Sequence, residues 1–184
     1  MRIGYIGLGA LGSELARRFV ADHELTVWDL NNHAAAPLAQ AGARVASSAA
    51  ELARQSDVIL LCLPRSADVR ELVFGSGGLA DGLSLGQLVI DQTSGVPKET
   101  AETATRLAAR GVAMMDAAVS ASPHVVAQGA TTLMAAAPDD VYERALPVLR
   151  AITEKIHRCG TRVGDGQAMK IVNNAMNAAC RLGT

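Results

Sequence analysis

A glycine-rich turn near the start of the chain constrains its fold more than any other feature. The apolar run Ile3–Ile6 leads straight into Gly7-Leu8-Gly9-Ala10-Leu11-Gly12, and residues 11–20 have the pattern of a helix. Strand, glycine turn and helix in this order are typical of a dinucleotide-binding unit. The first glycine permits the tight turn, the second lets the backbone approach a pyrophosphate, and the third lets the helix pack on the strand. The helix N-terminus then directs unpaired N–H groups at the phosphates.

An acidic residue follows the next predicted strand, Leu25–Trp28. Asp29 stands where a carboxylate accepts hydrogen bonds from the adenosine ribose hydroxyls. A 2′-phosphate at this place would be repelled, and Leu30-Asn31-Asn32 offers no Arg or Lys to receive one. The sequence therefore predicts a bound dinucleotide and favours NAD over NADP.

Composition excludes several other classes of protein. The chain has 184 residues, of which 49% are hydrophobic and only 3% aromatic, so an aliphatic core is expected, as suits helices packed on a buried parallel sheet. The net charge is −1 with no long run of either sign, and no apolar run approaches spanning length. We therefore expect no nucleic-acid partner and no contact with a membrane.

The three cysteines are few, odd in number and widely spaced. Cys62, Cys159 and Cys180 match neither a zinc site nor a disulfide framework, and the four histidines show no metal-ligand spacing. We expect no metal ion, and the cysteines are interpreted as buried apolar residues of a reducing compartment. With no signal peptide before the first strand, the expected location is the cytoplasm.

Short apolar runs alternate with amphipathic stretches along the chain. Strands are expected at 3–6, 25–28, 44–46, 57–63, 87–91, 112–115, 131–136 and 155–157. Helices are expected at 11–20, 34–41, 49–55, 66–74, 97–110, 138–152 and 164–182, the third with Ser48 and Glu51 as a capping box. This alternation predicts an α/β fold: a Rossmann-like, doubly wound, mainly parallel sheet with helices on both faces, ending in a long C-terminal helix.

Polar residues gather where the predicted strands end, and ligands of such sheets bind outside the carboxyl ends of the strands. Leu63-Pro64 ends one strand, Asp91-Gln92-Thr93-Ser94 ends the next, and Asp116-Ala117-Ala118-Val119-Ser120 follows a third. On the last helix, Lys170 and Asn174 lie four residues apart and therefore share one face.

Four blocks in this order resemble the β-hydroxyacid dehydrogenase family, which includes the 3-hydroxyisobutyrate and 6-phosphogluconate dehydrogenases. The first hexapeptide resembles the family's Gly-Leu-Gly-x-Met-Gly, and Asp91–Ser94 resembles its Asp-x-Ser-Thr. Asp116–Ser120 resembles its Asp-Ala-Pro-Val-Ser, and Gly166–Asn174 resembles its Gly-x-x-x-Lys-x-x-Asn-Asn. The resemblance covers the whole chain. It implies an NAD-dependent oxidoreductase that transfers a hydride between a small β-hydroxy acid, or its semialdehyde, and nicotinamide.

The resemblance also implies a role for each matching residue. Lys170 is the catalytic acid/base, Asn174 contacts the substrate, and Ser120 with the following Ala121 and Ser122 holds the substrate carboxylate. Because hydride transfer at a carbinol carbon also moves a proton on oxygen, a lysine whose pKa is lowered by burial suits this chemistry. The cofactor site comprises Gly7, Gly9, Ala10, Leu11, Gly12, Asp29 and Leu30, with Leu63, Pro64 and Ser94 near the nicotinamide.

The substrate loop departs from the family pattern. Where the family has Ser-Gly-Gly, this chain has Ser120-Ala121-Ser122-Pro123-His124. Added side chains, and a proline without an N–H, must reshape a surface on which glycine N–H groups would close on a carboxylate. We therefore expect a substrate other than 3-hydroxyisobutyrate, with Ser122 or His124 as a contact.

Family members continue through an interdomain helix into an all-helical domain that closes the active site and forms the dimer. The resemblance thus divides this chain into a dinucleotide-binding domain, residues 1–163, and the start of the interdomain helix, residues 164–184, with the C-terminal domain absent. The chain alone is expected to be inactive or weakly active, and a homodimer is expected through the last helix or the missing domain. Two alternatives are a non-catalytic NAD-binding or sensing module that associates through its last helix, and a nucleotide-binding methyltransferase.

Overall fold

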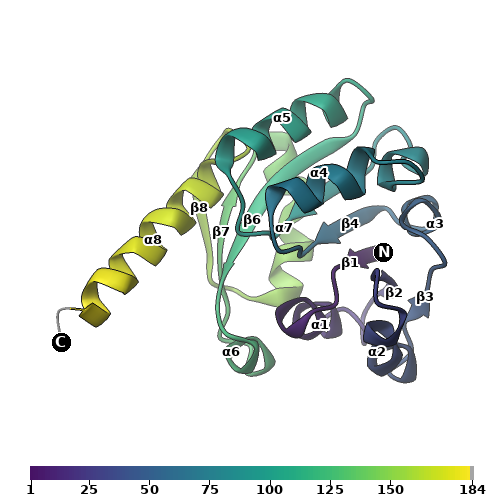
Figure 1. Ribbon diagram of the computed structural model, residues 1–184, viewed down its shortest axis with the longest axis horizontal. Helices are drawn as coiled ribbons and strands as arrows, with labels where there is room; N and C mark the ends of the chain where they lie inside the picture. Colours follow the sequence, from purple (N-terminus) through teal and green to yellow (C-terminus); the bar gives the residue numbers. More distant parts are fainter. Residues whose placement is uncertain (183–184) are drawn as a thin grey trace.

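The computed structural model describes residues 1–182, and within them eight strands form one sheet (Figure 1). The order is β3-β2-β1-β4-β5-β6-β7-β8, and each neighbouring pair is parallel except β6 with β7. The strands are β1 (Arg2–Ile6), β2 (Glu24–Trp28), β3 (Arg44–Val45), β4 (Val58–Leu61), β5 (Leu88–Asp91), β6 (Ala113–Ser120), β7 (Thr132–Ala136) and β8 (Ile156–Gly160). The predicted Rossmann-like, mainly parallel sheet is confirmed.

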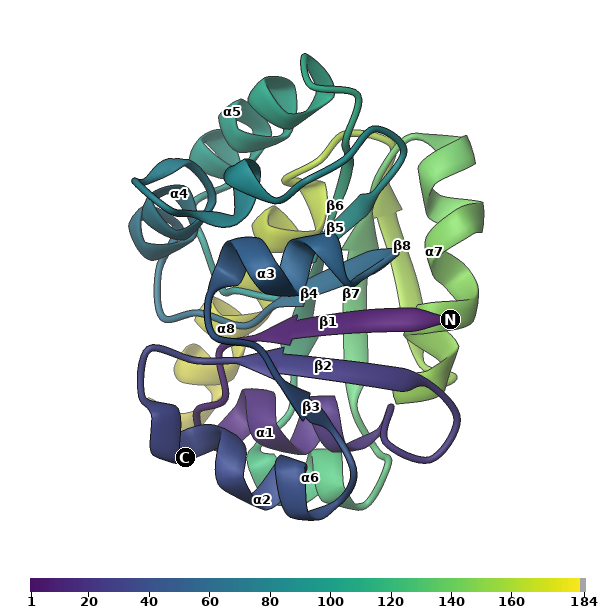
Figure 2. The ribbon, with the colours of Figure 1, turned by 90° about the vertical axis from the view of Figure 1, so that its right-hand side faces the viewer.

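Helices cover both faces of the sheet, and each face has its own apolar core. Residues of α1, α2, α6 and α7 pack on one face, and residues of α3, α4 and α5 pack on the other (Figure 2). β4 and β5 lie between these layers and are buried along their whole length, as expected of central parallel strands. The helices are α1 (Ala10–Arg17), α2 (Ala36–Gln40), α3 (Ala49–Arg54), α4 (Ser66–Phe74), α5 (Pro97–Ala108), α6 (Pro123–Ala127), α7 (Asp139–Ile152) and α8 (Asp165–Leu182), with short 3-10 helices at Asn32–Ala35 and Leu79–Asp81.

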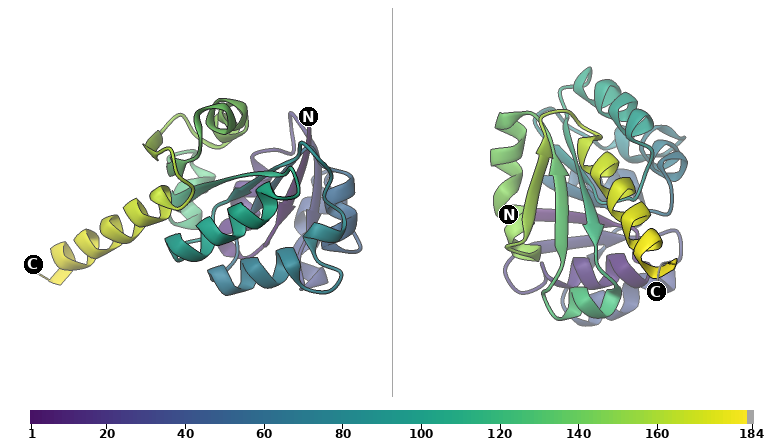
Figure 3. Two further views of the ribbon diagram at one scale, coloured as in Figure 1. Left: turned by 90° about the horizontal axis from the view of Figure 1, so that it is seen from above. Right: turned by 90° about the vertical axis from the view of Figure 1, so that its left-hand side faces the viewer.

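The last helix, α8, begins against the sheet and then leaves it. Its first residues contact β6, β7 and β8, whereas its C-terminal half extends away from the rest of the chain (Figure 3). Over residues 171–181 every side chain except that of Asn173 is exposed. The expectation that Cys180 is buried was therefore wrong, because Cys180 lies in this exposed part of α8; Cys62 and Cys159 are half-buried.

The structure corrects the predicted elements around Asp116–Ser120. β6 continues through Ser120, so Asp116–Ser120 lies within the strand and does not follow it. The extension exists because β7 pairs antiparallel with this segment, from Asp116 opposite Ala136 to Ser120 opposite Thr132. Helix α6, which the sequence patterns did not predict, begins at Pro123 directly after this strand.

The predicted capping box at α3 forms in a modified way. The Ser48 hydroxyl accepts a hydrogen bond from the Glu51 N–H at 3.1 Å, as expected. The Glu51 carboxylate, however, accepts from the N–H and hydroxyl of Ser47, one residue before the N-cap. These hydrogen bonds lower the pKa of Glu51 and fix the start of the helix.

No helix in the described part of the chain combines the length and the apolar character needed to cross a membrane.

Candidate functional site

A cleft of about 940 Å³ opens at the carboxyl ends of β1, β2 and β4. This edge of the sheet contains the point where the strand order reverses, between β1 and β4, which is where parallel sheets of this type bind ligands. The volume suits a ligand of nucleotide size. The cleft is lined by nine of the ten residues expected to bind the cofactor: Gly7, Gly9, Ala10, Leu11, Gly12, Asp29, Leu30, Leu63 and Pro64.

The three fingerprint glycines lie in different surroundings. Gly7 has φ +92°, and a Cβ there would overlap the carbonyl oxygen of Cys62. A Cβ on Gly12 would overlap the carbonyl oxygen of Gly7. A Cβ on Gly9 would meet no atom within 4 Å, since Gly9 faces open space at the N-terminus of α1. Gly7 and Gly12 are thus required by the fold, whereas the space beside Gly9 is free for a ligand.

The N-terminus of α1 is open towards this space. Gly9 is the N-cap, and within the described residues no side chain accepts a hydrogen bond from the first turn. The first N–H groups of a helix lack intrahelical partners and attract anions. The residues present therefore fit a pyrophosphate group.

Asp29 follows β2, and its carboxylate is held by backbone N–H groups of the segments that follow β1 and β2. Its Oδ2 accepts a hydrogen bond from the Leu8 N–H at 2.6 Å, and its Oδ1 accepts from the Asn31 N–H at 2.8 Å. These bonds orient the carboxylate at the mouth of the cleft, where each oxygen keeps a lone pair for a further hydrogen-bond donor. The neighbouring Leu30 is 89% exposed and leaves the mouth open.

Sequence reasoning missed a charged group on the other side of the cleft. Arg65, the N-cap of α4, lines the cleft together with Asp68 and Glu71. Its guanidinium donates to both Asp68 oxygens, at 3.0 and 2.9 Å, so its charge is partly neutralised. The signal was its position directly after Leu63-Pro64, at the carboxyl end of β4.

Ser94 stands apart from the other expected cofactor residues. It is exposed after the end of β5 and is not among the residues that line the cleft. Its neighbour Thr93 provides the link, because the Thr93 hydroxyl accepts a hydrogen bond from the Leu63 N–H at 3.1 Å. The loop after β5 is therefore linked to the cleft by the hydrogen bond between Thr93 and Leu63.

Of the expected substrate residues, Ser120 contacts α8 at the end of β6, but through Asn173 and not through the expected Asn174. Asn173 donates a hydrogen bond from Nδ2 to the Ser120 hydroxyl at 3.2 Å. Asn174, the residue expected to contact substrate, is exposed. Lys170 is half-buried one turn earlier on the same helix, and this burial lowers the pKa of its ammonium group.

The unusual substrate loop is the start of a helix. Ala121 is half-buried, Ser122 is the exposed N-cap of α6, and Pro123 is the first residue of α6. His124 is exposed and shares a hydrogen bond with Gln128 at 3.0 Å. Ser122 and His124 are thus exposed, and α6 begins directly after the residues that depart from Ser-Gly-Gly.

A buried polar cluster, which sequence reasoning did not identify, joins the first turn of α8 to β5 and β6. Asp91, Asp116 and Gln167 are each 0% exposed. Asp116 accepts hydrogen bonds from the N–H groups of Gly164 and Gln167, both at 2.7 Å, and so caps the start of α8. Burial raises the pKa of Asp91 to about 7 and that of Asp116 to about 6. Gln167 was missed because a glutamine on a helix gives no local signal of burial.

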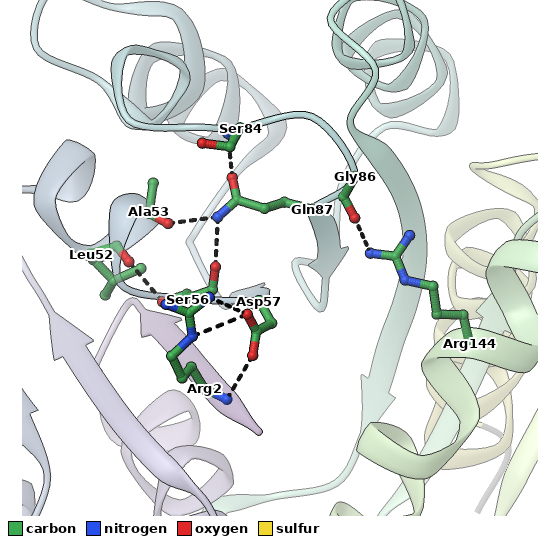
Figure 4. A network of polar contacts seen from close by, with 9 residues as sticks. All are labelled: Arg2, Leu52, Ala53, Ser56, Asp57, Ser84, Gly86, Gln87 and Arg144. Carbon is green, nitrogen blue, oxygen red and sulfur yellow. Dashed lines mark hydrogen bonds and ion pairs between the residues drawn. The ribbon is translucent and has the colours of Figure 1, made fainter.

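A smaller cleft of about 380 Å³ lies at the opposite edge, near the amino ends of β1, β4 and β5. Its polar side chains bond mainly to one another and to nearby backbone (Figure 4). Gln87 donates to the carbonyl oxygens of Ala53 and Ser56, at 2.7 and 2.6 Å, and accepts from the Ser84 N–H at 2.5 Å. Because parallel sheets bind ligands at the other edge, we assign this network a structural role.

Comparison with known proteins agrees with this geometry. Residues 2–161 match the family model described as the NAD binding domain of 6-phosphogluconate dehydrogenase. The L-threonate dehydrogenase of Escherichia coli (strain K12) is 35% identical over 177 residues, which are 95% of this chain and 58% of that protein. The mitochondrial 3-hydroxyisobutyrate dehydrogenase of Mus musculus is 32% identical over 183 residues, which are 99% of this chain and 54% of that protein.

Solved structures give the same result. The Mycobacterium tuberculosis 3-hydroxyisobutyrate dehydrogenase determined with L-serine superimposes with a TM-score of 0.92 at 29% identity. The match covers 99% of this chain and 62% of that one. The chain thus spans less than two thirds of the length of each of these relatives.

Proposed function

The chain belongs to the β-hydroxyacid dehydrogenase family and contains its NAD(P)-binding domain; on that premise we propose that it serves an oxidoreductase that acts on a small β-hydroxy acid or its semialdehyde. The observation that supports this proposal most strongly is the placement of Lys170. Half-buried on α8, it lies one turn before Asn173, which bonds to Ser120 at the carboxyl end of β6.

Within this proposal the nicotinamide cofactor, when bound, supplies the hydride chemistry. Lys170 manages the proton: its ammonium group donates a proton to the carbonyl oxygen during reduction, and its neutral amine accepts the hydroxyl proton during oxidation. Burial lowers the pKa of Lys170 and so brings it closer to working pH. Ser120, with its hydroxyl oriented by Asn173, offers a hydrogen bond to the substrate carboxylate together with Ala121 and Ser122.

Asp29 supports NAD as the preferred cofactor. Its carboxylate is oriented by two backbone N–H groups at the mouth of the cleft, where a ribose would donate hydrogen bonds and a 2′-phosphate would be repelled. Arg65 lines the same cleft but is bonded to Asp68 through both carboxylate oxygens. We therefore propose NAD as the cofactor, with NADP the weaker ligand.

The domain division is part of the same proposal. Residues 1–163 form the dinucleotide-binding domain, and residues 164–184 begin a helix that leads towards a further domain; of these, residues 183–184 lie outside the described part of the chain. A homodimer through α8 or that further domain, and a cytoplasmic location, belong to this proposal. The exposed apolar side chains on α8 support an association there: Met169, Ile171, Val172 and Met176.

Calorimetric titration of the chain with NAD+, NADP+ and S-adenosylmethionine, followed by NAD-linked oxidation assays on a panel of β-hydroxy acids, tests the proposal. Binding of NAD+ together with turnover of at least one hydroxy acid supports it. Binding without turnover in the complete protein would favour the non-catalytic module. Binding of S-adenosylmethionine alone would favour a methyltransferase.

A further inference from the structure

A single buried glutamine joins α8 to the ends of two central strands. The side chain of Gln167 donates from Nε2 to Asp91 Oδ2 at 3.2 Å and to the carbonyl oxygen of Thr93 at 3.1 Å. Its Oε1 accepts from the Thr100 hydroxyl at 2.7 Å, and its backbone N–H donates to Asp116. Both hydrogens of the amide and its oxygen are therefore bonded, which leaves the side chain one orientation.

The same network reaches the nucleotide cleft in two steps. Thr93, whose carbonyl oxygen accepts from Gln167, also accepts at its hydroxyl from the N–H of Leu63. The Thr93 N–H in turn donates to Asp91 Oδ1 at 2.9 Å. Because Leu63 lines the cleft, one residue separates the cleft wall from the residue that anchors α8.

Two glycines let the backbone approach this network closely. A Cβ on Gly95 would lie 2.9 Å from Gln167 Nε2, and one on Gly166 would lie 2.8 Å from Asp116 Oδ2. Both distances are shorter than real Cβ contacts, so a side chain at either position would displace these polar groups. The loop after β5 and the start of α8 are therefore packed closely against the polar groups that anchor this helix.

Lys170 lies three residues after Gln167, on the same face of α8. Beyond it, Asn173 makes the hydrogen bond to Ser120. The helix is thus held on both sides of Lys170: by Gln167 in the interior and by Asn173 at the end of β6. Past Asn173 the helix extends away from the sheet (Figure 3).

We propose that Gln167 is the positioning residue that holds Lys170 in register with the nucleotide cleft, so that a cofactor bound in the cleft changes the proton affinity of Lys170. Gln167 itself touches no reactant. The inference rests on the proposed function, because it presumes that a nicotinamide dinucleotide occupies the cleft. A displacement of about 1 Å in such a constellation can cost about 100-fold in rate, so a residue that fixes the position of Lys170 matters for turnover.

The test compares two buried glutamines at opposite ends of β5. Gln167→Met removes the three side-chain hydrogen bonds at the carboxyl end and keeps a long, unbranched side chain. Gln87→Met removes three comparable hydrogen bonds at the amino end, in the network of Figure 4, and does not touch α8. Thr100→Val, which removes only the donor to Gln167 Oε1, replaces Gln167→Met if that variant does not fold.

The readout is the titration midpoint of the Lys170 side chain, followed by NMR in protein with labelled lysine, without and with saturating NAD+. We expect a shift on NAD+ binding in the unaltered chain and in Gln87→Met, and a shift reduced to less than about half in Gln167→Met. The dissociation constant for NAD+ should stay within about threefold in all three proteins, because no substitution touches the cleft lining. Lost stability alone would affect both variants alike.

The possible outcomes distinguish failure of this inference from failure of the proposed function. If the unaltered chain binds neither NAD+ nor NADP+, the proposed function fails, and the inference fails with it. If NAD+ binds but Lys170 does not respond in the unaltered chain, or responds equally in Gln167→Met, the positioning role is overturned while the proposed cofactor stands.

Discussion

The carboxylate of Asp29 accepts a hydrogen bond from the backbone N–H of Leu8 at 2.6 Å, which ties the acidic residue after β2 to the glycine turn after β1. The two residues are 21 positions apart in the sequence. Their contact makes the proposed phosphate-binding turn and the proposed ribose-binding group parts of one wall of the cleft.

This contact yields a prediction for cofactor choice. Replacing Asp29 by Asn and Leu30 by Arg removes the repulsion of a 2′-phosphate and adds a cation at an exposed position. The ratio of NAD+ to NADP+ affinity, measured by calorimetry, should fall by about tenfold or more, since a charged hydrogen bond contributes about 1.5–3 kcal/mol. Equal affinity of the unaltered chain for both cofactors would refute the role of Asp29.

Substitutions at two of the fingerprint glycines should have different effects on stability and on NAD+ affinity. Gly9→Ala adds a methyl group where no atom lies within 4 Å, so the free energy of unfolding should fall by less than about 1 kcal/mol. Affinity for NAD+ should still drop by about tenfold or more, because the methyl group occupies the approach of the pyrophosphate.

Gly12→Ala is the matched control, because its methyl group would overlap the Gly7 carbonyl oxygen within the fold. Overpacking of this kind costs about 1–3 kcal/mol, so this variant should lose stability first. Urea unfolding and calorimetry on both variants make the comparison. Full NAD+ affinity in Gly9→Ala would contradict the assigned phosphate site.

Stability should depend on pH through the buried carboxyl groups. Burial raises the folded-state pKa of Asp91 to about 7 and of Asp116 to about 6, from 3.8 in both cases. The native state therefore retains protons that the unfolded chain has released. The contribution of these two groups is greatest at low pH and declines between about pH 4 and pH 7, by up to about 1.4 kcal/mol per pH unit for each group.

Asp91→Asn tests this sign. The variant should lose some stability at every pH, because Thr93 and Gln167 donate to different oxygens of Asp91 and the NH2 group that replaces one of these oxygens cannot accept. Its unfolding free energy should nevertheless decline less steeply between pH 4 and pH 7. Parallel profiles for the variant and the unaltered chain would show that Asp91 titrates normally in the folded state.

The loop after Ser120 should determine substrate choice. Changing Ala121 and Ser122 to glycine restores flexibility and removes the side chain at the N-cap of α6. On a panel of β-hydroxy acids, the complete protein carrying both changes should shift its preference, by kcat/KM, towards 3-hydroxyisobutyrate. An unchanged order of preference would exclude this loop as a specificity element.

The features that the sequence predicted are those with local causes. The glycine turn after β1 and the helix start at Pro97 follow from backbone rules that act over a few residues. The apolar run of β4 signals a strand buried on both faces, and the structure places it at the centre of the sheet.

The features that the sequence did not predict depend on distant partners. β6 reaches Ser120 only because β7, beginning 12 residues later at Thr132, pairs with it antiparallel. In the sequence Gln167 is an ordinary helical residue, and only the fold brings Asp91 and Thr93 to its side chain. Asn173 and Asn174 are adjacent in the sequence, and only the direction in which α8 leaves the sheet decides which one meets Ser120.

The most direct test of the proposed function is turnover by Lys170→Ala, with Lys98→Ala, at an exposed position on α5, as the control. In the complete protein, NADH formation from the preferred hydroxy acid should fall by about 100-fold to 10,000-fold in kcat, the usual contribution of a general acid/base. The NAD+ dissociation constant should stay within about twofold, and the control should retain full activity. Near-normal turnover in Lys170→Ala would contradict the account.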